Sequence, residues 1–239
     1  MNIETISLLT SAIILLAVRH SLDLDHVVAI TDITAAERNK RRALMSSFGY
    51  VSGHGAVTFV LGGIAYTIGI SLPDEFEAVM EKIVGGTLVI LAAAVLYSTI
   101  RYRDGTKIMS GWRFFSLLST KIFRLSEKAG THKNGAHKHK PDGKVGFLSS
   151  VIIGAIHGIG VESPTQMAFL GSAATLQSPS IGFVAILLFV FTVMVANMSL
   201  AILLVTGFQS AKHKNSLFLF LSVASAAFGA YVGIKMLFS

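Results

Sequence analysis

A polar run interrupts the first apolar segment of the chain. Residues 19–26 read Arg-His-Ser-Leu-Asp-Leu-Asp-His, so His20, Asp23, Asp25 and His26 stand close together between two apolar stretches. A charged side chain at the centre of a membrane-spanning helix costs at least about 2.5–3.5 kcal/mol. Imidazole and carboxylate groups together suit Ni²⁺, Co²⁺, Zn²⁺, Cu²⁺ or Fe²⁺. We therefore predict that this run supplies ligands for a divalent transition metal.

Three further residues of the same chemical types lie in other apolar segments, namely His54, His157 and Glu162. The chain has no cysteine, which excludes thiolate ligands and disulfides. Two other interpretations stay open at this point. The same groups could pair with one another and only hold the helices together, or they could carry protons across the membrane.

The spacing of the run does not suit a regular helix. At about 100° per residue, His20, Asp23 and His26 fall on one arc, whereas Asp25 points elsewhere. The rise between the two histidines is about 9 Å, which is long for two ligands of one ion. No glycine or proline lies in the run, yet we expect local distortion of the helix here. Arg19 is either a counter-ion for an aspartate or extends toward the lipid headgroups, and we assign it no ligand role.

The composition predicts the elements that position these residues. The 239 residues are 52% hydrophobic and only 14% charged, whereas a soluble domain is about a quarter charged. We predict an all-α polytopic membrane protein. The glycine pairs at 62–63 and 85–86 are expected to let helices pack closely in lipid. Six predicted spans cover residues 3–35, 43–70, 79–100, 145–173, 181–208 and 217–238.

Cationic residues divide the chain into two membrane units. The loops after the first, third and fifth spans hold nearly all the lysines and arginines, which predicts that these loops are cytoplasmic and both termini outside. Residues 1–100 form the first three-helix repeat, and 145–239 form the second. Between them, 101–144 form a basic cytoplasmic loop in which 112–125 is predicted to be an amphipathic surface helix. The histidines within 132–139 could form a cytoplasmic metal-receiving loop, but a solvated basic linker is favoured, because the neighbouring lysines repel cations.

The two halves share a pattern of polar residues. In each half the first span carries a histidine followed five residues later by an acid, and the second span carries an isolated polar residue. These residues are His20, Asp25 and His54 in the first half, and His157, Glu162 and Asn197 in the second. The pattern and the loop charges predict two inverted three-helix repeats, with broken or distorted helices and a binding site at the midplane.

The polar run resembles the signature of the nickel/cobalt transporter (NiCoT) family. Residues 19–30, Arg-His-Ser-Leu-Asp-Leu-Asp-His-Val-Val-Ala-Ile, are similar to the family's Arg-His-Ala-x-Asp-Ala-Asp-His-Ile. Ser52-Gly53-His54 resembles the family's Leu-Gly-His-Ser element. The resemblance implies metal binding and selectivity at the run, and it implies a ligand role for His54.

The fourth span is similar to shorter relatives that are grouped with urease accessory membrane proteins. Residues 157–166 carry their His-Gly-x-Gly-x-Glu-x-Pro-Thr-Gln pattern. Two elements depart from the longer family members. Glu162 and Gln166 stand for the Asp and Glu of one element, and the late element around Asn197 has no aspartate.

Together these features predict a secondary transporter in the cell membrane that takes up Ni²⁺, or Co²⁺, through a His/Asp site at the midplane. The metal is the transported substrate, and no resident cofactor is expected. No P-loop and no His-Glu-x-x-His occurs in the chain, so neither direct use of ATP nor an enzyme is expected. The alternative is proton-coupled metal export, or a permease for another solute on the same scaffold.

The expected partners are the metal ion and the lipid bilayer. Nickel-enzyme maturation proteins are a further class of partner that the resemblance suggests. The net charge of +7 is explained by membrane topology, because the cations lie in loops beside apolar spans. We therefore expect no nucleic-acid partner.

Overall fold

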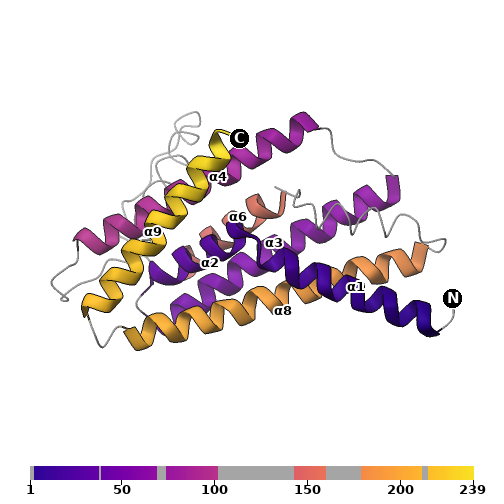
Figure 1. The fold of residues 1–239 in the computed structure, drawn as a ribbon, viewed down its shortest axis with the longest axis horizontal. Helices are drawn as coiled ribbons and strands as arrows, with labels where there is room; N and C mark the ends of the chain where they lie inside the picture. Colours follow the sequence, from indigo (N-terminus) through magenta and orange to yellow (C-terminus); the bar gives the residue numbers. More distant parts are fainter. Residues whose placement is uncertain (1–2, 38, 69–73, 102–142, 160–178, 212–214) are drawn as a thin grey trace, which may run out of the picture.

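A computed structural model describes residues 3–37, 39–68, 74–101, 143–159, 179–211 and 215–239. Within these ranges the chain forms seven helices and no strand, which confirms the all-α class (Figure 1). The helices are α1 (Ile3–Ser21), α2 (Leu24–Ala35), α3 (Lys40–Ile68), α4 (Asp74–Arg101), α6 (Gly143–Ile159), α8 (Pro179–Ala211) and α9 (Asn215–Leu237). The predicted amphipathic helix at 112–125 and most of the loop that contains it lie outside the described residues.

Four of these helices, α3, α4, α8 and α9, are long and apolar enough to cross a membrane. α1 and α2 together would make a fifth span, bent by 55° at their junction. α6 is shorter, with 17 residues, and the predicted fourth span at 145–173 is described only as far as Ile159. The described part of the chain thus contains four or five helices that could span a membrane, and a total of six stays a prediction.

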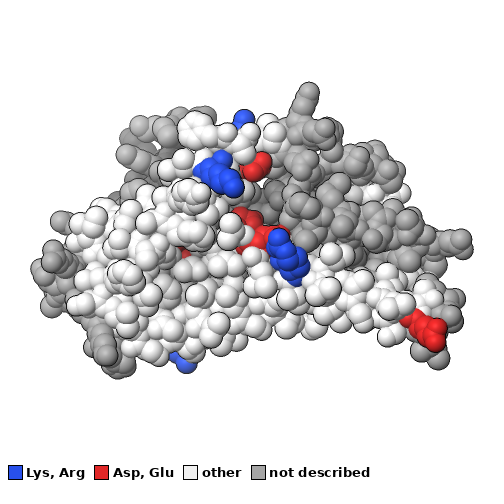
Figure 2. All heavy atoms as spheres, viewed as in Figure 1, with Lys and Arg blue, Asp and Glu red and all other residues white. Residues whose placement is uncertain are grey.

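The outward faces of these helices are apolar. Leu8 is 73% exposed and Phe220 is 68% exposed. Figure 2 shows few charged side chains among the described residues of one face of the molecule. A surface this rich in exposed apolar side chains would promote association in water, but it suits contact with lipid.

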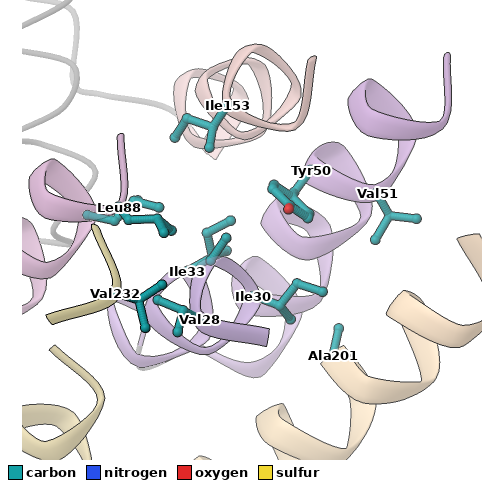
Figure 3. Close-up of a cluster of buried hydrophobic side chains, with 11 residues drawn as sticks. Val28, Ile30, Ile33, Tyr50, Val51, Leu88, Ile153, Ala201 and Val232 are labelled. Atoms are coloured by element: carbon teal, nitrogen blue, oxygen red, sulfur yellow. The ribbon is translucent and has the colours of Figure 1, made fainter. Parts of the chain in front are cut away.

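α2 lies at the centre of the bundle and packs against α3, α4, α8 and α9. Around it, α3 packs on α6 and α8, α4 packs on α9, and α1 packs on α8. The core cluster draws side chains from six helices (Figure 3): Val28, Ile30, Ile33, Tyr50, Val51, Leu88, Ile153, Ala201 and Val232. The short α2 is therefore held from several sides, and so is its first turn, which carries Asp25 and His26.

Glycines at a spacing of four residues face each other across α3 and α6. Gly49 and Gly53 lie on α3, and Gly154 and Gly158 lie on α6. A Cβ at Gly49, Gly53, Gly154 or Gly158 would meet backbone atoms of the other helix. Small residues at this spacing let helix backbones approach closely in lipid, so these glycines set the distance between α3 and α6.

The α3–α6 approach determines which polar residues lie near each other. A Cβ at Gly154 would overlap the carbonyl group of Tyr50. A Cβ at Gly158 would come 2.8 Å from the carbonyl oxygen of His54. Because His157 precedes Gly158, the close approach brings this histidine into the same part of the bundle as Tyr50 and His54.

One predicted packing glycine also joins α4 to α9. A Cβ at Gly85 would come 2.7 Å from the carbonyl oxygen of Gly233, which confirms Gly85 as a close-packing position. A Cβ at Gly86 would meet nothing within 4 Å, and one at Gly63 would meet only Phe183 at an ordinary 3.7 Å. Packing therefore does not require glycine at Gly86 or Gly63.

Candidate metal centre

The first predicted span is broken at Leu22 and Asp23, between α1 and α2. Asp23 is the N-cap residue of α2 and has an extended backbone, with φ −64° and ψ 145°, which is the usual conformation at a helix start. Its carboxylate makes no capping hydrogen bond and instead forms an ion pair with Arg19. The predicted distortion is thus present as a new helix start, without glycine or proline, and Arg19 acts as a counter-ion.

The break brings two histidine rings together. His20 lies in the last turn of α1 and His26 in the first turn of α2, with ring centroids 4.6 Å apart. His54 of α3 completes a histidine trio, with its ring centroid 4.6 Å from that of His26 and 5.6 Å from that of His20. Each of the three residues is at most 2% exposed. One ring nitrogen from each lies within 4.8 Å of the others.

Two aspartates hold the rings in position. Nδ1 of His26 hydrogen-bonds to Oδ2 of Asp25 at 2.7 Å, and Nδ1 of His20 lies 3.3 Å from Oδ2 of Asp23. Metal-binding histidines commonly donate one ring N–H to a carboxylate in this way, which fixes the tautomer and directs the other nitrogen toward the ion. The aspartate oxygens therefore lie against histidine nitrogens. Among the described residues, the cluster of donor atoms that could share one metal ion comes from the three histidines alone.

The ring nitrogens fit a transition-metal ion. Nε2 of His26 and Nδ1 of His54 are buried and hydrogen-bond to no group of the described residues. Such buried polar atoms are costly without a partner. Three nitrogens bound to one ion at about 2.1 Å lie about 3.4–3.6 Å apart, so donors within 4.8 Å need to move closer by at most about 1.4 Å. Three imidazoles suit Ni²⁺, Co²⁺, Zn²⁺ or Cu²⁺.

His157 lies beside the trio without joining it. The ring of Tyr50 is centred 6.3 Å from that of His54 and 5.5 Å from that of His157. Nδ1 of His157 donates to the carbonyl oxygen of Ile153 at 2.9 Å, and its buried Nε2 has no partner among the described residues. His157 is also close enough to Asp25 to interact with its charge. It is therefore a fourth nitrogen donor that neighbours the trio.

Six of the seven predicted site residues lie in the described part of the chain. Three form the trio, the two aspartates orient its rings, and His157 stands next to it. The seventh, Glu162, lies outside the described residues. The sequence predicted Asp25 as a metal ligand and Asp23 as a residue that orients or neutralises the site, and the structure places oxygens of both aspartates near histidine nitrogens.

Two neighbours of the site were not predicted from the sequence. Tyr50 is 0% exposed, and its position four residues before His54 was an available signal, since such residues share a helix face. Phe189 of α8 lies against His20, with ring centroids 5.8 Å apart, and no local pattern indicates it. Asn197 was predicted only as a repeat counterpart. It is 0% exposed, and its amide atoms hydrogen-bond to no described group.

Comparisons of the chain with protein-family models, with curated proteins and with solved structures found no match. The function of the chain is therefore inferred from the geometry of the trio and from the motif resemblance of residues 19–30.

Proposed function

We propose that the chain is a secondary transporter for divalent transition-metal ions that prefers Ni²⁺ and also accepts Co²⁺. The observation that carries the proposal is the histidine trio. Its three buried imidazoles come from both sides of a helix break and from a neighbouring helix, and their donor atoms lie within 4.8 Å. Imidazole donors without thiolates suit these ions.

The depth of the trio favours transport over a structural role. His54 lies at the middle of the 29-residue α3, and the other two histidines flank the break in the first span. Secondary transporters form their sites near the bilayer midplane from discontinuous helices. A metal site that only held helices together would need no such break.

The helix contacts support the proposal of two inverted three-helix repeats. In that arrangement α3 corresponds to α8, α4 corresponds to α9, and the broken first span corresponds to the span that begins with α6. α3 packs on α8 and α4 packs on α9, as counterparts near a two-fold axis do. α6 packs on α3 just as α1 and α2 pack on α8.

Alternating access would then come from movement of one half against the other. The first half supplies the trio, and the second half supplies His157 together with Glu162. We further propose six spans in the cell membrane with both termini outside, because the lysines and arginines concentrate in alternate loops.

Uptake of radiolabelled nickel by proteoliposomes tests the proposed function. Under an inward metal gradient, we expect liposomes with the protein to take up the label faster than empty liposomes. Under an outward gradient, they should lose trapped label faster. Unlabelled Co²⁺ should compete and Mg²⁺ should not, because nitrogen ligands disfavour cations that prefer oxygen. Nickel movement no faster than in empty liposomes under both gradients would reject the proposal.

Asp25→Asn should weaken metal binding by about 10- to 100-fold without abolishing it, as loss of a carboxylate behind a metal-binding histidine does. Titration of the purified protein with Co²⁺, followed by its visible absorbance, measures the affinity. Asp23→Asn is the matched control and should have the smaller effect, because Asp23 lies farther from its histidine and also pairs with Arg19. Complete loss of binding in Asp25→Asn would make Asp25 a direct ligand, and unchanged affinity would remove it from the site.

A further inference from the structure

A second buried polar contact joins α2 to α9, away from the histidine trio. Asp32 of α2 is 0% exposed, and the hydroxyl group of Ser225 donates to its Oδ1. Its Oδ2 is buried and has no hydrogen-bond partner among the described residues. Gly229, one turn further along α9, leaves room for this oxygen, since a Cβ there would come 2.5 Å from it. α9 thus accommodates the carboxyl group closely.

No charged group of the described residues compensates Asp32. α2 packs against α3, α4, α8 and α9, and α8 contains no charged residue and no histidine. The titratable side chains described on the other helices are Lys40, Arg41, Arg42, Tyr50, His54 and Tyr66 on α3, Glu81, Lys82 and Tyr97 on α4, and Tyr231 and Lys235 on α9. None of these, and neither Asp25 nor His26 on α2 itself, interacts with Asp32, whose one polar contact within the described part of the chain is Ser225.

A proton is the ligand that this site can hold. An ionised carboxylate without a counter-charge is costly in an apolar helix bundle. One proton that bonds to Oδ2 makes the group neutral, while Oδ1 keeps the hydrogen bond from Ser225. A hard metal cation takes about six to eight oxygen ligands, whereas Asp32 and Ser225 offer only a carboxyl group and one hydroxyl.

Asp32 is mechanically connected to the trio through α2. It stands six residues after His26 on the same unbroken helix, a rise of about 9 Å. A movement of α2 that changes the position of His26 must therefore also change the fit of Asp32 against α9. Loss of the proton would leave an uncompensated charge in that contact, which favours separation of α2 from α9 and access of water.

We propose that Asp32 is a proton-binding site that couples metal transport to protons. It holds one proton on Oδ2 while α2 packs against α9, and it releases that proton to water when the two helices separate. This inference rests on the proposed transport function. Because linkage is reciprocal, proton binding at Asp32 changes the metal affinity of the trio, and metal binding changes the proton affinity of Asp32 by the same factor.

Proteoliposomes that contain a pH-sensitive dye test the coupling. Addition of Ni²⁺ to wild-type liposomes should produce a proton flux that accompanies metal movement. Asp32→Asn imitates the protonated carboxyl group, so it should bind Ni²⁺ with the affinity that the wild type has when Asp32 is protonated, but it should show no metal-driven proton flux above that of empty liposomes. Ser225→Ala retains the carboxyl group, so it should retain the flux, with its pH profile shifted to higher pH because one donor to the ionised form is gone.

The outcomes separate this inference from the proposed function. Wild-type protein that moves no metal rejects the proposed function, whereas metal transport with full proton flux in Asp32→Asn overturns only the role of Asp32.

Infrared spectra of the metal-free protein in lipid give an independent measure of the protonation of Asp32. At neutral pH a carboxylic-acid band should be present in the wild type and absent from Asp32→Asn, and its absence from the wild type overturns the inference. If Asp32→Asn does not fold, Gly229→Ala should lower the flux, because its Cβ displaces the carboxyl group.

Discussion

His26→Ala should abolish metal binding by the purified protein. The ring of His26 is centred 4.6 Å from each of the other two rings of the trio, so its removal takes away the central donor. The affinity should fall by more than about 100-fold, since even the loss of a group behind a ligand costs about 10- to 100-fold. His54→Ala should behave in the same way. Titration with Co²⁺, followed by its absorbance, measures the loss of metal binding in each variant, and uptake of radiolabelled nickel measures the loss of transport.

The thermal stability of His26→Ala distinguishes loss of a ligand from loss of the fold. Without metal, the variant should still unfold cooperatively but at a lower temperature than the wild type, because removal of the buried ring leaves a cavity and takes away the hydrogen-bond partner of Asp25. With metal at about 100 times the dissociation constant, the wild type should gain about 2.7 kcal/mol and the variant nothing.

His137→Ala is the matched control for the trio, because the sequence assigns His137 to the basic linker. It should bind and transport metal as the wild type does. Wild-type metal affinity in both His26→Ala and His54→Ala would contradict the trio as the binding site.

Gly154→Ala should cause the largest loss of stability among single methyl additions at the glycines that the structure describes. The new Cβ would overlap the carbonyl group of Tyr50, and a helix backbone cannot move aside as a flexible side chain can. Overpacking of this kind typically costs about 1–3 kcal/mol and sometimes more. The unfolding temperature in detergent, followed by the circular dichroism of the helices, measures the effect.

Gly86→Ala provides the control for Gly154→Ala. A Cβ at Gly86 would meet nothing within 4 Å, so the change should stabilise the helix by about 0.5–1 kcal/mol. Because α3 carries both Tyr50 and His54, Gly154→Ala should also weaken metal binding. Equal unfolding temperatures for the two variants would contradict the close α3–α6 contact.

Local patterns were sufficient to predict the helical class and most of the candidate site. Long apolar stretches indicate helices wherever they occur, and polar groups inside them stand out because burying such groups is costly. For the same reason, His20, His26, His54 and His157 could be identified without knowledge of which helices touch.

The break in the first span could be expected from the sequence but not located. The expectation arose from the rise of about 9 Å between His20 and His26 on a regular helix. In the structure the new helix start at Asp23 brings their ring centroids to 4.6 Å. The same break pairs Asp25 with the neighbouring ring of His26, and a direct ligand role for Asp25 stays a prediction from the sequence.

From the sequence alone one can conclude that this chain is helical and apolar and that it carries histidines and carboxylates where burying them is costly. Which of these groups meet depends on the packing of the helices. The trio requires α3 to lie beside the broken first span, and the contact between Asp32 and Ser225 joins residues 193 positions apart. Residue periodicity extends over a few helical turns, whereas distances between helices depend on how their surfaces fit, as the glycines of α3 and α6 illustrate.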